Sequence, residues 1–431
     1  MDKEEKVQKV RSYHGTSRDG KIILHMDEAE AGADPSGMPE GEFTLHIETS
    51  DVTQQTGEEV QTEKPAQTHK KKKPKHEIYL DVMRIVAILF VLFSHTEGYE
   101  LFSECVAGSF GYGFFIILSV FSLSSPMMFF MISGALLLDK EESIKDIWSK
   151  RILRIFIVLF GATLMYYVSD VIAGRDSFSS LMDVFKFIGD LYSKERVAPL
   201  WYLYAYMGFL ITLPFLRPMA KNMKDADFIY MMILITVIKL VLPEMEEKAF
   251  LGRYTLNASL SASWPGGTTI FYPLMGYYLH KRADRKTLMK LLPVFWGVTV
   301  VAMGVIIYNT KFYTTYIEGV KVYTGYFSWG RYYAALSLFA TVKLLFGYRS
   351  CRPFTKKVLN SISGCVMGIY IFHPAILDRI VFFGNIRDKL FGELTGAVRI
   401  WPELAWIAII FLTSFTITWI LRRIPIVKKY L

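Results

Sequence analysis

The sequence predicts an all-α polytopic membrane protein with about ten transmembrane helices and with its N- and C-termini in the cytoplasm. The chain has 431 residues, of which 52% are hydrophobic and 15% are aromatic, and its mean hydropathy is +0.28. Soluble domains rarely combine such values, and apolar runs long enough to span a bilayer recur along this chain. The distribution of lysine and arginine between the connecting segments supplies the orientation.

Residues 1–76 differ from the rest of the chain because they are polar and poor in aromatic side chains. Such a segment cannot bury enough apolar surface to offset its conformational entropy, so we expect a disordered cytoplasmic tail. The tail ends in the basic cluster His69–His76. A basic cluster directly before a first apolar run is typical of a cytoplasmic flank that contacts lipid headgroups, and we assign it no nucleic-acid partner.

Ten apolar segments follow and define one membrane domain, residues 77–431. They lie at 78–96, 112–138, 152–172, 199–216, 227–243, 267–280, 289–308, 328–348, 358–381 and 403–421. The first apolar run begins only near residue 78, so we expect no cleavable signal peptide. That run would then act as an uncleaved membrane anchor.

The density of positive charge alternates between successive connections. The connections 139–154, 217–226, 281–290, 349–357 and 422–431 hold 21 lysines and arginines in 55 residues. The opposite connections 97–111, 170–198, 244–266, 309–327 and 382–402 hold 11 in 107 residues. Because positive charge accumulates on the cytoplasmic side, this difference predicts that both termini lie there.

The first apolar run carries three ionisable side chains, Asp81, Arg84 and His95. His95 lies eleven positions after Arg84, which places both on one helix face about 16 Å apart along the axis. Asp81 lies one turn before Arg84 and can pair with it. Charged groups in a bilayer are costly unless they face protein or water, so this row is a candidate functional site. A snorkelling arginine and a packing histidine are the simpler alternatives.

A second group of cations, Arg151 and Arg154, begins the third apolar segment. Residues three apart share a helix face, and paired guanidinium groups suit phosphate or carboxylate. Both arginines also fit the positive-inside pattern, which is the simpler explanation. Lys239 and Lys343 lie near the ends of later apolar runs, where snorkelling to the interface would account for them.

These residues resemble a family signature in identity and spacing. Arg84 and His95, separated by ten residues and followed by Arg151-x-x-Arg154, are similar to the signature pair of the bacterial membrane acyltransferase 3 family. Further stretches agree in order and spacing, namely 130–136, 200–204 through Pro214, 271–278 and 363–374. The resemblance spans about residues 77–431 and does not extend to the polar tail.

The resemblance implies transfer of an acyl group, usually acetyl, from cytoplasmic acyl-CoA to a hydroxyl of a cell-envelope carbohydrate or related acceptor. It implies the bacterial cytoplasmic membrane as the location, and neither a metal nor a prosthetic group. A neutral imidazole can take the proton of an alcohol that attacks a thioester, so His95 is the expected general base, with a transient acyl-histidine as the variant. Arg84, Arg151 and Arg154 would hold acyl-CoA. Arg84 would also belong to the catalytic group, and Asp81 would orient it or be a simple interface charge.

Four further residues are expected on the acceptor side or in support of the site. They are Ser133, Trp201, Tyr370 and His373. His373 precedes Pro374, which frees a backbone carbonyl and is expected to kink the ninth helix, so a packing histidine at the kink is the alternative to a place near the acceptor. With Arg84 near the inner surface, His95 would lie toward the outer half of its helix. A central cavity would therefore have to bring the thioester to His95.

Two alternatives from other classes stay open at this point. A transporter or exporter of a glycan or lipid-linked precursor would line its path with the same arginines and histidine. A sensor or ligand-binding membrane module would use the tail to reach partners. An enzyme would consume thioester, whereas a transporter would move its substrate without acyl-CoA.

Overall fold

The computed structural model describes residues 13–18, 21–26, 77–96, 98–242, 246, 267–312, 315–317, 320–322 and 330–431. Contacts divide the chain into two units, Met1–Lys72 and Lys73–Leu431. In the first unit, β1 (Tyr13–Arg18) and β2 (Lys21–Met26) form an antiparallel hairpin. Most of the tail predicted for residues 1–76 lies outside the described residues, so its disorder stays a prediction.

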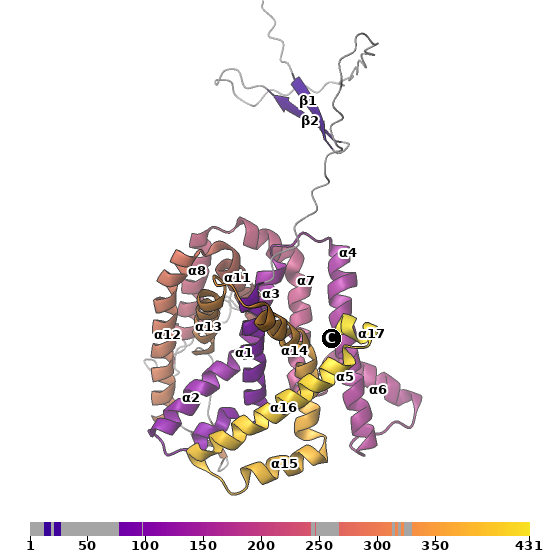
Figure 1. Ribbon diagram of the computed structural model, residues 1–431, viewed down its shortest axis with the longest axis vertical. Helices are drawn as coiled ribbons and strands as arrows, with labels where there is room; N and C mark the ends of the chain where they lie inside the picture. Colours follow the sequence, from indigo (N-terminus) through magenta and orange to yellow (C-terminus); the bar gives the residue numbers. More distant parts are fainter. Residues whose placement is uncertain are drawn as a thin grey trace, which may run out of the picture. The chain divides into compact units, whose positions relative to one another are not determined.

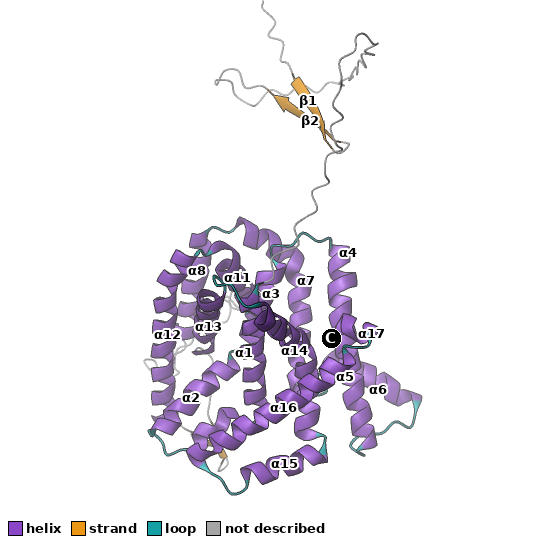
Figure 2. Ribbon diagram, viewed as in Figure 1, coloured by secondary structure: helices purple, strands orange, loops and turns teal. Residues whose placement is uncertain are grey.

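The second unit consists mainly of helices (Figures 1 and 2). The first half contains α1 (Ile78–His95), η1 (Gly98–Glu104), α2 (Phe110–Leu123), α3 (Ser125–Leu137), α4 (Ile144–Asp146), η2 (Ile147–Ile152), α5 (Leu153–Ile172), α6 (Leu181–Ser193), η3 (Ala198–Leu200) and α7 (Trp201–Asn222). The second half contains α8 (Asp225–Thr236), η4 (Val237–Val241), α11 (Thr268–Tyr277), η6 (Tyr278–Arg282), α12 (Arg285–Phe312), α13 (Gly330–Phe346), α14 (Pro353–Asp378), α15 (Val381–Phe391), η7 (Gly396–Arg399), α16 (Ile400–Leu421) and α17 (Pro425–Tyr430). Two short strands, β3 (Thr315–Ile317) and β4 (Val320–Val322), pair between α12 and α13.

Seven helical segments of the described residues are long and apolar enough to cross a membrane. They are Ile78–His95, Phe110–Leu137, Ile144–Ile172, Ala198–Asn222, Arg285–Tyr308, Pro353–Asp378 and Gly396–Leu421. The chain is therefore a multi-pass helical membrane protein, as its sequence predicts. The other three predicted segments coincide with shorter helical stretches at 225–241, 268–282 and 330–346. The count of ten spans and the side on which the termini lie stay predictions.

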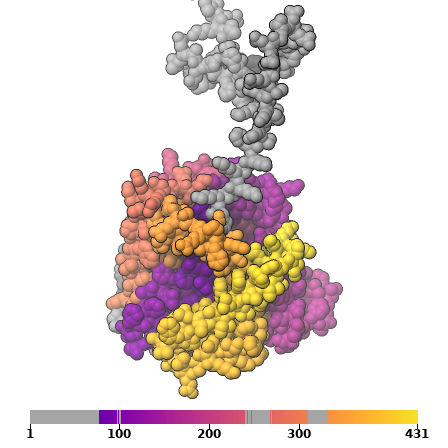
Figure 3. Space-filling view, viewed as in Figure 1, coloured from indigo at the N-terminus to yellow at the C-terminus, as the bar shows by residue number. Residues whose placement is uncertain are grey.

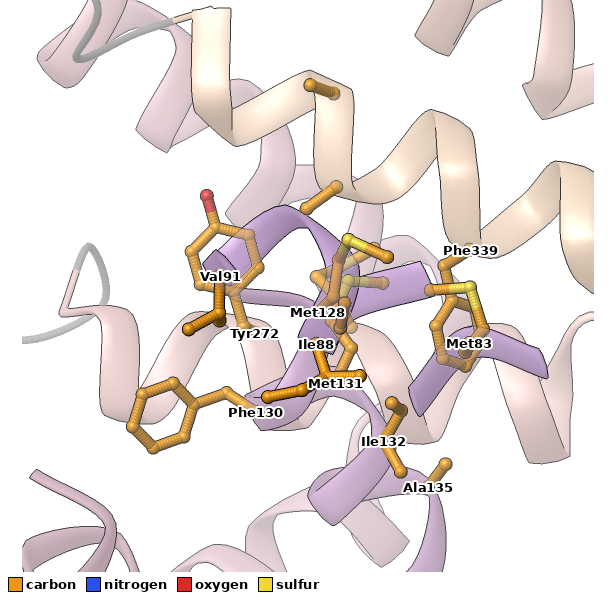
Figure 4. Packing of buried hydrophobic residues seen from close by; sticks show 14 of the residues in the cluster. Met83, Ile88, Val91, Met128, Phe130, Met131, Ile132, Ala135, Tyr272 and Phe339 are labelled. Atoms are coloured by element: carbon orange, nitrogen blue, oxygen red, sulfur yellow. The ribbon is translucent and has the colours of Figure 1, made fainter. Parts of the chain in front are cut away.

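The packed interior of the second unit forms around α1 and α3. Met83 and Ile88 of α1 and Met128 and Met131 of α3 are fully buried, and Figure 4 shows these side chains gathered in the interior. Both helices carry apolar residues on several faces and can be buried on several sides, as expected of a central helix in a membrane bundle. The two helices therefore give the site a well-packed framework.

Two glycines lie where the backbones of α3 and α11 cross, and they have the closest neighbours of all the described glycines. A Cβ atom added at Gly134 would lie 1.9 Å from the Pro273 carbonyl oxygen, and one added at Gly276 would lie 2.0 Å from the Met131 carbonyl oxygen. Small residues let two membrane helices approach backbone to backbone. The stretches 130–136 and 271–278, singled out by the resemblance, therefore form one packing contact.

Lys343 corrects an expectation from the sequence. Lys343 is only 6% exposed, and its Nζ donates to the carbonyl oxygens of Leu279, His280 and Ala283. A cation at the carboxyl end of a helix satisfies carbonyl groups that lack helical partners. Lys343 therefore fastens α13 to the end of η6, and the snorkelling explanation was wrong for it. The side chain of Lys239 lies outside the described residues.

A cluster of charges at the end of α5 ties three parts of the bundle together. Asp170 accepts from Arg196 over 2.7 Å and from Arg175 over 3.0 Å, and it also accepts from Arg379 at the end of α14. Arg196 binds Asp176 over 2.7 Å as well, which lowers the pKa of the Asp176 carboxyl group. The cluster joins α5 and α14, two of the helices that surround the cavity described below, to the connection before α7.

The last helices cover one side of the unit. In the space-filling view, the residues from α14 onward, in orange to yellow, occupy much of the visible face (Figure 3). Gly368 lets two of these helices come close, since a Cβ at Gly368 of α14 would lie 2.2 Å from Thr418 of α16. The C-terminal helix α17 lies beside α5 (Figure 1).

Candidate active site

A cavity of about 490 Å³ gathers most of the predicted site residues. Its walls come mainly from α1, α3, α5, α7 and α14. Seven predicted residues line it, namely Arg84, His95, Ser133, Arg151, Arg154, Trp201 and Tyr370. The two others, Asp81 and His373, each contact a lining residue. Arg84 and His95 therefore share one face of α1, as their spacing predicts.

Arg84 is held by its own helix and by α14. Its Nη1 donates to Asp81 Oδ1 over 3.0 Å and to Ser363 Oγ over 3.2 Å. The Ser363 hydroxyl donates in turn to Asp81 Oδ1 over 2.7 Å. Asp81 is 1% exposed, and a buried carboxylate needs such partners. The predicted pairing of Asp81 with Arg84 is confirmed, and Ser363 joins that pair to a second helix.

Arg151 lies in the π-helical turn η2 and is bound by a carboxylate from the preceding connection. Its Nε donates to Glu142 Oε2 over 2.7 Å, and its Nη2 donates to Glu142 Oε1. This side-on arrangement uses two adjacent donors of the guanidinium group and leaves Nη1 for other partners. The predicted anion-binding arginine is therefore already held in one orientation.

Glu142 also accepts from Arg217 of α7, whose Nη2 lies 2.7 Å from Glu142 Oε2. Hydrogen bonds from Arg151 and Arg217 lower the pKa of the Glu142 carboxyl group to about 2, with the bond from Arg151 the largest cause. Glu142 therefore carries its negative charge throughout the physiological pH range. The three side chains form an ion-pair network that connects α7 to η2.

Arg154 lies one turn beyond Arg151 and has a different partner. Its Nη2 and Nε donate to the carbonyl oxygen of Tyr430 over 3.2 and 3.4 Å. Leu431, the residue after Tyr430, lines the cavity together with Lys150. The first turns of η2 and α5 and the residues of α17 therefore meet at the same end of the cavity. Three cations of this segment, Lys150, Arg151 and Arg154, line that end.

A pair of histidines occupies the other end of α1. The ring centroids of His95 and His373 are 5.2 Å apart. His373 is fully buried, and neither of its ring nitrogens has a hydrogen-bond partner among the described residues. Its ring also lies 5.9 Å from that of Tyr370, whose hydroxyl donates to the carbonyl oxygen of Pro199. His373 therefore lies directly behind the candidate base instead of lining the cavity.

Aromatic side chains from α7 line much of the remaining wall. Tyr202 and Tyr206 are stacked, with ring centroids 5.9 Å apart, and the ring of Tyr202 meets that of Tyr370 edge to face. Ser133 lies on the facing helix and donates to the carbonyl oxygen of Phe129 over 2.8 Å. The cavity therefore combines a cationic end, an aromatic wall and an imidazole. Such a lining can hold an anionic ligand with an apolar arm.

Several lining or supporting residues were not selected from the sequence. They are Glu142, Lys150, Tyr206, Arg217, Arg331 and Ser363. Arg331 lies in the first turn of α13 and carries a charge inside a predicted apolar segment, the same signal that pointed to Arg84. Ser363 lies in a stretch that the resemblance singles out, but nothing in that stretch points to Arg84. Glu142 and Arg217 gave no signal, because each looks like one of many charges in a polar connection.

Fold and site together define a multi-pass membrane protein with a cavity between a group of arginines and a histidine pair. The family model described as an acyltransferase domain matches residues 77–423, most of the chain. The chain therefore belongs to the acyltransferase 3 family, which confirms the resemblance, and it is a membrane acyltransferase. Neither the curated proteins nor the solved structures include a match to this chain. The roles of individual site residues stay predictions.

Proposed function

We propose that this protein moves an acyl group, most simply acetyl, from cytoplasmic acyl-CoA to a hydroxyl of a cell-envelope carbohydrate or related acceptor in the bacterial cytoplasmic membrane. The observation that carries the proposal is the cavity, where Arg84, Arg151 and Arg154 line the same space as His95. Guanidinium groups match phosphate in charge and geometry. Imidazole is the side chain best suited to proton transfer near neutral pH.

In the proposed reaction, the acceptor hydroxyl oxygen attacks the thioester carbonyl carbon while a ring nitrogen of His95 takes the hydroxyl proton. The carbon–sulfur bond then breaks, and the protonated His95 returns the proton to the departing sulfur. The products are an ester and the CoA thiol, so no proton is gained or lost overall. Because a thioester is already activated, a positioned base is expected to suffice, without a metal or prosthetic group.

The charge pattern of the chain supports a cytoplasmic entrance for the donor. Arg151 and Arg154 lie at the end of a connection rich in lysine and arginine, and Arg84 and His95 are about 16 Å apart along their helix. The phosphates of an extended donor would lie among the arginines while its thioester reaches His95. Asp81 would orient Arg84. On the acceptor side, support would come from Ser133, Trp201, Tyr370 and His373.

The first experiment measures acetyl-CoA binding by the purified protein in detergent. We expect saturable binding by the wild type and at least a tenfold weaker affinity, about 1.4 kcal/mol, in the double variant Arg151→Ala/Arg154→Ala. The matched control is Arg349→Ala/Arg352→Ala. It removes two arginines with the same spacing from another connection, and neither lines the cavity.

The control variant should bind acetyl-CoA like the wild type. Equal weakening in both double variants would show that Arg151 and Arg154 contribute only general positive charge. No binding by a well-folded wild type would reject the donor assignment and favour a transporter instead.

A further inference from the structure

The ion-pair network around Glu142 connects the cavity to α3 and α7, two helices that do not follow one another in the sequence. Arg217 is 6% exposed, and its Nε donates to the carbonyl oxygen of Leu137, the last residue of α3, over 3.1 Å. The same guanidinium group binds Glu142 Oε2 over 2.7 Å. Arg217 therefore caps α3 and helps to fix the position of the Glu142 carboxylate, through the same Oε2 that accepts from Nε of Arg151.

Glu142 in turn fixes the orientation of Arg151, which lines the cavity. Its two oxygens accept from Nε and Nη2 of Arg151, a bidentate contact that restrains both the direction and the plane of the guanidinium group. An arginine side chain otherwise loses considerable rotamer freedom when it binds a ligand. Held by Glu142, Arg151 has lost most of that freedom before a ligand arrives.

We propose that Glu142 is a positioning residue for the donor, in that it holds Arg151 with Nη1 available to a CoA phosphate, with Arg217 as its support. The inference rests on the proposed function, because it takes acyl-CoA as the ligand of Arg151. Glu142 itself does not line the cavity. It acts through Arg151.

Glu142 has two opposing effects on the affinity for the donor. Its negative charge weakens the attraction of Arg151 for phosphate, so removal of that charge alone would tighten binding. Its hydrogen bonds restrain Arg151, so their removal would weaken binding by the cost of ordering one long side chain. The network keeps a net positive charge, since one carboxylate lies between two guanidinium groups. We therefore expect the restraint to dominate.

The test compares Glu142→Gln with Glu141→Gln. The adjacent Glu141 has a side chain that is 89% exposed and is paired with Lys221 over 3.1 Å, so its replacement removes the same charge from the same connection. For Glu142→Gln we expect the KM for acetyl-CoA to rise about fivefold while kcat stays within about twofold. For Glu141→Gln we expect both constants to equal those of the wild type.

A second donor separates an effect on phosphate binding from general damage to the enzyme. S-acetyl-pantetheine has the thioester arm of acetyl-CoA and none of its phosphates. Its kcat/KM should be the same in Glu142→Gln and in the wild type. If Glu142→Gln does not fold, Glu142→Asp retains the charge but shortens the reach to Arg151, and it should raise the KM for acetyl-CoA in the same way.

An unchanged or lowered KM for acetyl-CoA in folded Glu142→Gln would overturn the inference. So would an equal rise in Glu141→Gln, or, where only Glu142→Asp folds, wild-type constants in that variant. A wild type that neither binds nor consumes acetyl-CoA would instead reject the proposed function, so the two failures are distinguishable.

Discussion

His95 and His373 are neighbouring imidazoles that differ in their access to the cavity. His95 lines the cavity, whereas His373 is fully buried behind it with a ring-to-ring distance of 5.2 Å. A general base must reach the proton that it abstracts, which only the ring that lines the cavity can do directly. His95 is therefore the residue whose loss should remove the chemistry, while His373 can act only through its neighbour.

We expect His95→Ala to lower acyl transfer by at least about 10²-fold, because proton transfer in the transition state loses its acceptor. Membrane insertion and acetyl-CoA binding should persist, since the arginines are untouched. The control is His280→Gln, which alters a histidine that lies beside Tyr79 and not in the cavity. The measurement is release of CoA thiol with the acceptor present, and transfer at the wild-type rate by His95→Ala would contradict the assignment.

Among the helices, α3 and α11 show why some apolar segments carry glycine at fixed places. Gly134 and Gly276 lie where each backbone meets the other, and no side chain separates them. By contrast, a Cβ at Gly304 of α12 would meet nothing within 4 Å. The two kinds of glycine look alike in the sequence, and only the packing of the helices distinguishes them.

Gly276→Ala should therefore destabilise the folded protein, by about 1–3 kcal/mol or more, because the helices would have to separate. Gly304→Ala should be neutral or slightly stabilising, because alanine favours a helix and has room there. The measurements are the yield of monodisperse protein and its thermal midpoint in detergent. Equal midpoints for the two variants would show that the α3–α11 crossing can adapt.

For the whole molecule, the membrane itself determines how much can be predicted from sequence. Hydropathy located the long apolar helices because a bilayer requires them, and ionisable side chains in or beside those runs, together with the resemblance, located Arg84, His95, Arg151 and Arg154. The contacts that organise the site were not predictable in the same way. Glu142 binds Arg217, which is 75 residues away in the chain, and Ser363 binds Asp81 across 282 residues. Hydropathy and local spacing contain no information about such pairs.

The placement of the molecule in a bilayer can be tested at α6. This helix begins with a capping box between Ser180 and Asp183, and it exposes the apolar side chains Leu181, Phe185 and Ile188. An exposed apolar face on a helix between two membrane spans favours a position in the membrane interface. We expect a nitroxide label at Phe185→Cys to be accessible to oxygen in the lipid phase.

The matched control for that label is Lys186→Cys, on the adjacent helix position, which should favour a water-soluble relaxation agent. Both variants need Cys105, Cys351 and Cys365 replaced by serine, since these cysteines are free. Equal exposure of the two labels to water would place α6 away from the lipid.

The crossing of α3 and α11 also limits how the cavity can change its width. Two backbones in direct contact cannot slide or tilt independently, so the wall formed by α3 moves only together with α11. Another wall carries Arg151 and Arg154, where Arg154 donates to the main-chain oxygen of Tyr430 and Leu431 lines the same end of the cavity. Such bonds exchange readily with water. A change in the width of the cavity should therefore be easier where Tyr430 and Leu431 meet Arg154 than at the crossing of α3 and α11.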